Sequence, residues 1–254
     1  MKKHQTTISL FIFFSFYFFG FSVFAQDAKE IVRKAEEKFN GEKSSYSEIS
    51  MTIVRPKYQR NIEFKSWTES AGSALTLIIA PAKEKGQSFL KSENNMWSWN
   101  PSIQRLIKMP PSMLSQGWMG SDYTNDDILK ESSLVKDYSH KITGKENIAG
   151  MSCYKIELLP LEETNVIWGK IIIWISEKEY FQLKTEFYDE DNYLVKTHKS
   201  SEIMMFDDRK LPSVMEILPA NEQGNKTVVR IKTIKFNIRI EPDFFSQQNM
   251  KKVK

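Results

Sequence analysis

Apolar residues recur at helical spacing near the start of the chain and then change to alternation. Between Asp27 and Phe39 the apolar side chains share one stripe: Ala28, Ile31, Val32, Ala35 and Phe39. This spacing predicts one amphipathic helix, and Asn40-Gly41 is typical of a helix end. The next segment predicts a strand that Pro56 ends, because apolar and polar side chains alternate along it: Ile49, Met51 and Ile53 against Glu48, Ser50 and Thr52.

Similar alternating segments, bounded by turn residues, fill most of the remaining chain. They predict about ten or eleven antiparallel strands after the single N-terminal helix. The last long strand is expected from about Lys226 to Ile240, and its apolar parity shifts between Ile231 and Ile234, which predicts a β-bulge or a barrel corner. Because no linker, repeat or low-complexity tract divides these segments, residues 26–254 are expected to form one mainly β domain, a curved sheet or partial barrel.

Residues 1–25 have the pattern of a secretory signal peptide. Lys2 and Lys3 precede an almost wholly apolar run from Leu10 to Ala25, whose last residues offer a cleavage site. The run is shorter than the roughly 20 residues that a membrane-spanning helix needs, and an uncleaved anchor is the alternative. The mature chain is therefore predicted to start at Gln26 and to be located in the periplasm.

The charge balance and the single cysteine narrow the class of protein. The chain has 36 Lys and Arg residues against 32 Asp and Glu residues, and the predicted signal peptide carries two of the lysines. This near-balance, without a basic stripe, argues against nucleic-acid binding. Cys153 is the only cysteine, so the chain cannot form an internal disulfide, and its place in an apolar strand favours a packed thiol over a nucleophile.

The chain offers little catalytic material. His140 and His198 have no zinc-ligand spacing, and neither a G-x-S-x-G elbow nor a phosphate loop is present. Asp122, Asp126 and Asp127 do not fit a calcium-binding loop, and the last two are explained as the first turn of a helix that begins after Thr124-Asn125 and continues towards Leu134. We therefore predict a non-enzymatic protein without a metal or a cofactor.

The stretch from Asn95 to Asp127 is unusually rich in Met and Trp for a segment broken by Pro110-Pro111. Surface loops are ordinarily polar, because their backbone stays solvated. The segment either packs on the core of the protein or covers an apolar cavity that takes a ligand. Met side chains suit the second role, because they repack easily against different partners.

The alternating strands and this cover supply the candidate ligand-binding residues. Taken one at a time, each of them is better explained as plain core than as a ligand contact, and only together do they predict a cavity that the protein does not fill itself. Burial of one methylene is worth about 0.8 kcal/mol, so an exposed 16-carbon chain costs on the order of 12 kcal/mol and needs a protein to carry it through water. The predicted set is Ile49, Met51, Ile53, Ile62, Phe64, Leu77, Ile79 and Phe89 in the cavity, with Trp97, Met113, Trp118 and Met119 at the cover.

Three segments resemble the LolA-like outer membrane lipoprotein-sorting proteins. The resemblance lies in NNMWSWNP with Gln104 close behind, in SQGWMGSDYTNDD from Ser115 to Asp127, and in the C-terminal part that includes Asp243-Phe244-Phe245-Ser246. It covers nearly all of the predicted mature chain. It implies an incomplete, unclosed antiparallel β-barrel covered by a helical lid, as in LolA and LolB.

The resemblance also implies a function and partners. The cavity would hold the acyl chains of a lipoprotein or a lipid, and the protein, acting as a monomer, would meet an inner-membrane exporter of the resistance–nodulation–division (RND) type and an outer-membrane acceptor. In LolA an arginine of an Arg-Pro pair bonds to the lid and holds it closed. The comparable pair here is Ala80-Pro81, and Arg55-Pro56 lies one strand earlier, so this latch is expected to be absent or supplied elsewhere.

The sequence thus leads to one main hypothesis and two alternatives. The first is a periplasmic carrier that shields acyl chains for transfer towards the outer membrane. The second is an accessory module that docks on an RND-type transporter without carrying lipid. The third is an envelope enzyme that acts on lipid or glycan, for which no pair of acidic residues stands out.

Overall fold

The N-terminal apolar stripe forms helix α1 (Ala28–Asn40), as the sequence predicts. The structure, a computed structural model, describes residues 27–40, 43–69, 72–92, 95–129, 133–162, 164 and 166–254, so the predicted signal peptide lies outside the described residues. Ile31, Val32 and Ala35 of α1 are buried, and they pack in one cluster with Ile156 and Ile171 of the sheet. None of the described helices has the length and apolar character needed to cross a membrane.

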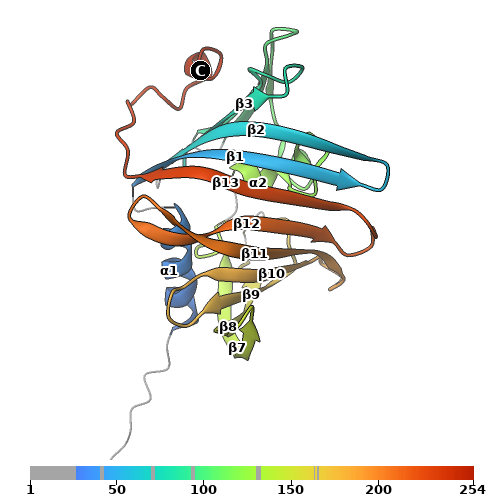
Figure 1. Ribbon diagram of the computed structural model, residues 1–254, viewed down its shortest axis with the longest axis vertical. Coiled ribbons are helices and arrows are strands. Elements are labelled where there is room, and N and C mark those ends of the chain that lie inside the picture. The colour runs from blue at the N-terminus through green and yellow to red at the C-terminus, as the bar shows by residue number, and fades with distance from the viewer. Residues whose placement is uncertain are drawn as a thin grey trace, which may run out of the picture.

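The strands of the described residues form one antiparallel sheet of thirteen, in the order β6-β5-β4-β3-β2-β1-β13-β12-β11-β10-β9-β8-β7 (Figure 1). The two end strands, β6 and β7, lie at opposite edges of the sheet, which confirms the predicted unclosed barrel. The first half comprises β1 (Ser44–Arg55), β2 (Tyr58–Glu69), β3 (Ala74–Ala80), β4 (Ser88–Ser92), β5 (Asn95–Asn100) and β6 (Arg105–Lys108). The second half comprises β7 (Tyr138–Ile148), β8 (Met151–Pro160), β9 (Lys170–Ser176), β10 (Gln182–Tyr188), β11 (Leu194–Phe206), β12 (Arg209–Pro219) and β13 (Lys226–Phe236).

The expected strand count of ten or eleven was too low, for local reasons. β4 is short and buried on both faces, so it shows no alternation, and β7 is mostly polar and exposed. The predicted irregularity in β13 is confirmed, because the partners of neighbouring β1 residues pass from Thr233 for Glu48 directly to Ile231 for Ile49. This bulge lets apolar side chains on both sides of it face the same way.

The sheet has an inner face, which packs against α1 and the central segment, and an outer face. Figure 1 shows α1 along the lower half of the sheet and the C-terminal segment at its upper end. The C-terminal segment packs on the outer face of the upper strands. Its Phe244 and Phe245, and Met250 of helix α3 (Gln247–Met250), contact the cluster that contains Trp67 and Leu90. The C-terminal segment therefore covers part of the outer face, and any apolar ligand site has to be sought on the inner face.

Candidate functional site

Residues 109–129, hereafter the lid, cross the inner face of the sheet. They contain two short 3-10 turns, η1 (Pro111–Met113) and η2 (Trp118–Gly120), and helix α2 (Asn125–Leu129). The turn of the lid is tight: Met119 has a φ of 54°, and a Cβ added to Gly117 would lie 2.4 Å from the carbonyl oxygen of Ser121. Only glycine fits at position 117 without moving the backbone.

The underside of the lid is apolar, and Trp118 is its centre. Its side chain is 1% exposed and meets the rings of Phe64 and Phe89 edge-on, with centroids 5.1 and 5.4 Å away. The indole Nε1 has no hydrogen-bond partner among the described residues. An unpaired buried donor costs about 1–3 kcal/mol, so packing rather than polar bonding holds this side chain.

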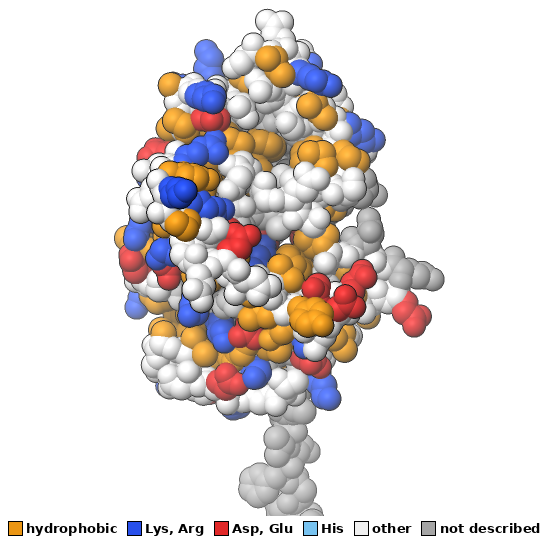
Figure 2. All heavy atoms as spheres, turned by 90° about the vertical axis from the view of Figure 1, so that its right-hand side faces the viewer, with side chains coloured by type: hydrophobic (Ala, Val, Ile, Leu, Met, Phe, Trp, Pro, Cys, Tyr) orange, Lys and Arg blue, Asp and Glu red, His pale blue; other side chains and the backbone are white. Residues whose placement is uncertain are grey.

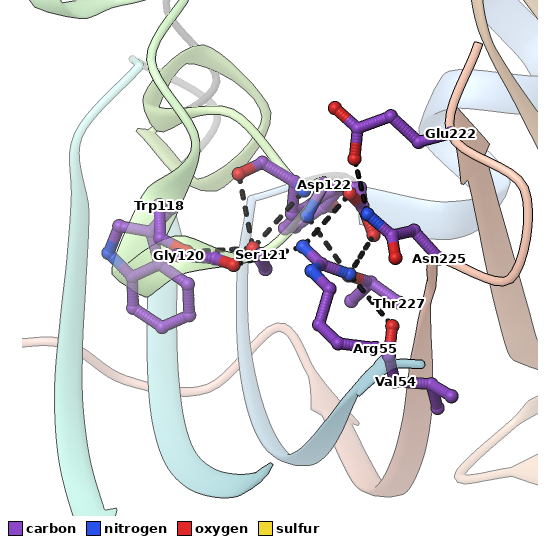
Figure 3. A network of polar contacts seen from close by, with 10 residues as sticks. Val54, Arg55, Trp118, Gly120, Ser121, Asp122, Glu222, Asn225 and Thr227 are labelled. Atoms are coloured by element: carbon purple, nitrogen blue, oxygen red, sulfur yellow. Dashed lines mark hydrogen bonds and ion pairs between the residues drawn. The ribbon is translucent and has the colours of Figure 1, made fainter. Parts of the chain in front are cut away.

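Polar contacts at the edge of the lid hold its turn to the sheet. Arg55, the last residue of β1, donates from Nη1 and Nη2 to the two carboxylate oxygens of Asp122, each at 3.0 Å, and from Nη2 to the carbonyl oxygen of Gly120 at 3.0 Å. Thr227 of β13 donates to the same carboxylate at 2.7 Å. In Figure 3 these groups converge on one side of the lid turn while the Trp118 ring points away from them. Arg55 and Asp122 are 15% and 9% exposed, so solvent screens the pair only weakly.

This contact corrects the expectation that Arg55 lies one strand too early to reach the lid. Arg55 lies opposite Tyr58 at the turn of the β1–β2 hairpin, and the lid turn meets the sheet at this end of the two strands. Arg60 of β2 adds a hydrogen bond from Nη1 to the carbonyl oxygen of Met119 at 2.8 Å. Ala80-Pro81 is a cis peptide at the end of β3, and the arginine at the lid comes from the hairpin instead.

A second polar anchor fixes α2 to the other half of the sheet. Asp127 accepts from the backbone nitrogen and the hydroxyl of Thr124, which caps the helix, and from Nζ of Lys196 on β11 at 2.5 Å. The side chains of Lys196 and Asp127 are 5% and 12% exposed. Burial alone would raise the pKa of the Asp127 carboxyl, but the charge of the nearby Lys196 and the hydrogen bonds from Lys196 and Thr124 hold that pKa below its ordinary value.

His198 lies beside this anchor in a neutral state. Its ring packs on Phe187 at 4.6 Å and faces Tyr123 at 6.2 Å, and Nε2 has no partner among the described residues. Burial, reinforced by the charge of Lys196, lowers the pKa of His198 to about 3. The folded protein therefore binds this proton only in strong acid, whereas the unfolded chain binds it below pH 6.5 or so.

Acidification is expected to lower the free energy of unfolding through His198. As pH falls from about 6.5 towards 3, the unfolded state binds a proton at His198 that the folded state does not bind. The free energy of unfolding therefore falls by at most about 1.4 kcal/mol per pH unit. Urea unfolding at pH 7, 6 and 5 measures this slope above the range in which Asp127 titrates. We expect His198→Gln to flatten the slope and His140→Gln, at a less buried site, to change it less. An equal slope in the wild type and His198→Gln would contradict this account.

A cavity of about 180 Å³ remains on the inner face between α1, the lid and the sheet. Part of its wall is apolar, with Ile49, Phe64, Ile128 and Val229 from the strands and the lid. Serine and threonine side chains of β1, β2 and β3 form another part. On the side of the molecule drawn in Figure 2, exposed hydrophobic side chains lie in separate groups with charged residues between them.

The structure brings nine of the twelve predicted site residues together. They pack in or against the cluster beneath the lid: Ile49, Met51, Ile53, Ile62, Phe64, Phe89, Met113, Trp118 and Met119. Of these, Ile49 and Phe64 also line the cavity. The rest fill the space under the lid, so in this closed arrangement they are core, and they become ligand contacts only if the lid moves.

Three predicted site residues do not join them. Trp97 lies on the outer face, opposite Leu90 and in the cluster with Met250 and the C-terminal segment, because alternation on β5 turns Met96 rather than Trp97 inward. Ile78 of β3 faces the lid, so its neighbour Leu77 points to the outer face. Ile79 lies at a register shift between β2 and β3, where alternation does not decide its direction. The expectation that Trp97 and Leu77 belong to the cavity or its cover is corrected accordingly.

The sequence reasoning missed several residues beneath the lid. Leu114 and Ile128 of the lid, both buried, fall within the Met- and Trp-rich segment and could have been included on that signal. Ile217 of β12 and Val229 of β13 reach the same cluster only because β13 pairs with β1, which no local pattern reveals. The set was incomplete where sheet order, rather than alternation, decides the neighbours.

The sequence matches a family model, and the architecture matches solved structures. A family model whose description reads "-like: Uncharacterized protein" matches residues 71–252. No curated protein matches the sequence. Among solved structures, a DUF1329 family protein from Desulfovibrio piger ATCC 29098 superimposes with a TM-score of 0.79 at 21% identity, over 88% of this chain and 97% of that chain.

Two further solved structures share this fold. A domain from Vibrio parahaemolyticus, described as that of an outer membrane lipoprotein-sorting protein, has a TM-score of 0.78 at 20% identity, over 88% of this chain and 98% of its own. A LolA superfamily protein from Nitrosomonas europaea has a TM-score of 0.76 at 21% identity, over 88% and 99%. The chain therefore belongs to the family of the matching model, and its fold, an unclosed antiparallel sheet under a lid, is that of LolA-like proteins.

Proposed function

We propose that this chain is a periplasmic carrier that shields the acyl chains of a lipoprotein or a lipid beneath its lid for transfer towards the outer membrane. The observation that carries the proposal is the construction of the lid. Its underside is apolar and adjoins a cavity, whereas its attachments to the sheet at Arg55 and Lys196 are polar and separable. Such a cover can leave the sheet when something apolar replaces it.

The volume of the cavity and the free energy of acyl-chain burial favour a lid that moves. The cavity of about 180 Å³ is smaller than the roughly 300–1,000 Å³ of ordinary ligand pockets, so an acyl chain needs the space that Trp118 and its neighbours fill. Burial of a 16-carbon chain gains on the order of 12 kcal/mol. Opening of the lid separates the Arg55–Asp122 pair but returns both charges to water, so the ligand can offset this cost while the lid side chains repack against it.

The remaining parts of the proposal follow from the same reasoning. A signal peptide at residues 1–25 would deliver the protein to the periplasm. An inner-membrane RND-type exporter would load it and an outer-membrane acceptor would unload it, with the carrier acting as a monomer. We propose no catalytic role, because the two carboxylates of the lid, Asp122 and Asp127, are paired with Arg55 and Lys196 and hold the lid and its helix.

Lipid extraction of the natively purified protein, followed by mass spectrometry, tests the proposal directly. We expect an acylated molecule in about equimolar amount, and after delipidation a saturable uptake of a fluorescent fatty-acid probe. Met205→Ala, which removes an exposed apolar side chain that belongs neither to the cluster beneath the lid nor to the cavity wall, is the control and should bind the probe normally. A protein that is empty after native purification and ignores the probe would contradict the carrier function, and capture of a transporter by that same protein would favour the docking role.

A further inference from the structure

The inner face of β1 changes from aliphatic to hydroxyl side chains along its length. Met51 and Ile53 pack beneath the lid, and Ile49 lies at the boundary. Towards the start of the strand the same face carries Ser47 and Ser45, because side chains two apart share a face. The strand thus has an apolar end under the lid and a polar end beyond it.

The neighbouring strands change at the same level. Ser47 lies opposite Ser66, which lies opposite Thr76, and Ser45 lies opposite Thr68. These five side chains line the cavity and are called here the hydroxyl row. The Ser45 and Thr68 oxygens are 2.7 Å apart, and the Ser66 and Thr76 oxygens are 3.5 Å apart, at the outer limit of a hydrogen bond.

Two of these hydroxyl groups are buried and need hydrogen-bond partners. Thr76 is 1% exposed and Ser45 is 8% exposed. Burial of a hydroxyl costs free energy unless it is hydrogen-bonded, yet each hydroxyl has one donor and two acceptor positions, so pairing within the row uses only part of its capacity. The row can therefore bond to a polar group that enters the cavity.

The charged groups around the cavity are already paired. Lys38 of α1 lies 3.1 Å from Glu179 and stacks on the ring of Phe181, and Asp127 is paired with Lys196. A ligand in this cavity consequently meets hydroxyl groups rather than a free charge. This favours an uncharged head over a phosphate or an ammonium group.

We propose, building on the carrier function above, that the ligand is an amphiphile with an uncharged, hydrogen-bonding head of the glycerol-ester type. Its head lies on the hydroxyl row, and its acyl tail extends along β1 and β2 into the space beneath the lid. The direction follows from the order of side chains: hydroxyls at the α1 end of the cavity and aliphatic residues at the lid end. The ester and hydroxyl oxygens of such a head match the donors and acceptors of the row.

Competition against a fluorescent fatty-acid probe tests this head-group assignment. The competitors are 1-monopalmitoylglycerol and methyl palmitate, which share a tail and differ in the head. We expect the double variant Ser66→Ala/Thr76→Val to lose about tenfold in affinity for monopalmitoylglycerol and to keep its affinity for methyl palmitate within about twofold. Thr52→Val, which alternation places on the outer face of β1, is the matched control and should change neither.

The wild-type protein provides a second measurement that needs no variant. It should prefer 1-monopalmitoylglycerol over palmitate and over monopalmitoyl phosphatidic acid by at least about tenfold, because both competitors bring a charge to a cavity whose own charges are paired. Equal affinities for the three, or unchanged monopalmitoylglycerol binding in the double variant, would overturn the head-group assignment while leaving the carrier function intact. Failure of the wild-type protein to bind any acyl probe would overturn both.

Discussion

Replacement of Arg55 by alanine is expected to raise the affinity for a fluorescent fatty-acid probe by about ten- to a hundredfold. The arginine makes three hydrogen bonds to the lid turn, two of them to the Asp122 carboxylate in a largely buried pair. Loss of one partner from a fully buried pair costs about 3–5 kcal/mol. Here Thr227 still donates to Asp122, so we take a smaller cost of about 1.4–2.7 kcal/mol, which corresponds to ten- to a hundredfold. It falls on the closed lid, because Asp122 regains water when the lid opens. Apparent affinity rises as the open fraction rises.

The matched control is Arg230→Ala. Arg230 makes the same two-pronged contact with Glu202, but both side chains are about half exposed, so the pair contributes little. Fluorescence titration of the delipidated variants measures both affinities. If the two arginine variants bind the probe equally well, the lid is not held by Arg55.

Trp118→Ala should lower the free energy of unfolding by about 3–5 kcal/mol, because it empties the centre of the cluster between Phe64 and Phe89. Trp118→Phe should cost far less, since it keeps a ring in place and removes the unpaired indole N–H. Urea unfolding followed by circular dichroism gives both values. Similar losses for the two variants would show that the indole, rather than the bulk of the ring, is what the lid needs.

Local patterns predicted much of the fold. The stripe of Ile31, Val32 and Ala35 defined α1, and the alternation of Met51 and Ile53 identified the inner face of β1 correctly. The parity change near Ile231 located a real bulge. In each case one face is apolar and the other polar, so periodicity alone decides which side is buried.

The site could be predicted only where that contrast exists. β3 reads Leu75-Thr76-Leu77-Ile78-Ile79, with apolar residues on both faces, so alternation does not decide which of them point inward. The polar Thr76 lines the cavity wall, and the C-terminal segment packs on the opposite, apolar face. Contacts between Arg55 and the lid, or between Lys196 and α2, join residues far apart in the chain, which depends on sheet order.

The sheet is not closed between β6 and β7, and this affects how wide a ligand it can enclose. A closed barrel has a girth fixed by its strand number and stagger, so it accepts a narrow range of cargo widths. Here β6 and β7 share no ladder, so the sheet can uncurl or tighten by a change in coiling while every existing strand pair stays intact. Under the proposed carrier function, the same fold would take one hydrocarbon tail or several, with its span adjusting to the load.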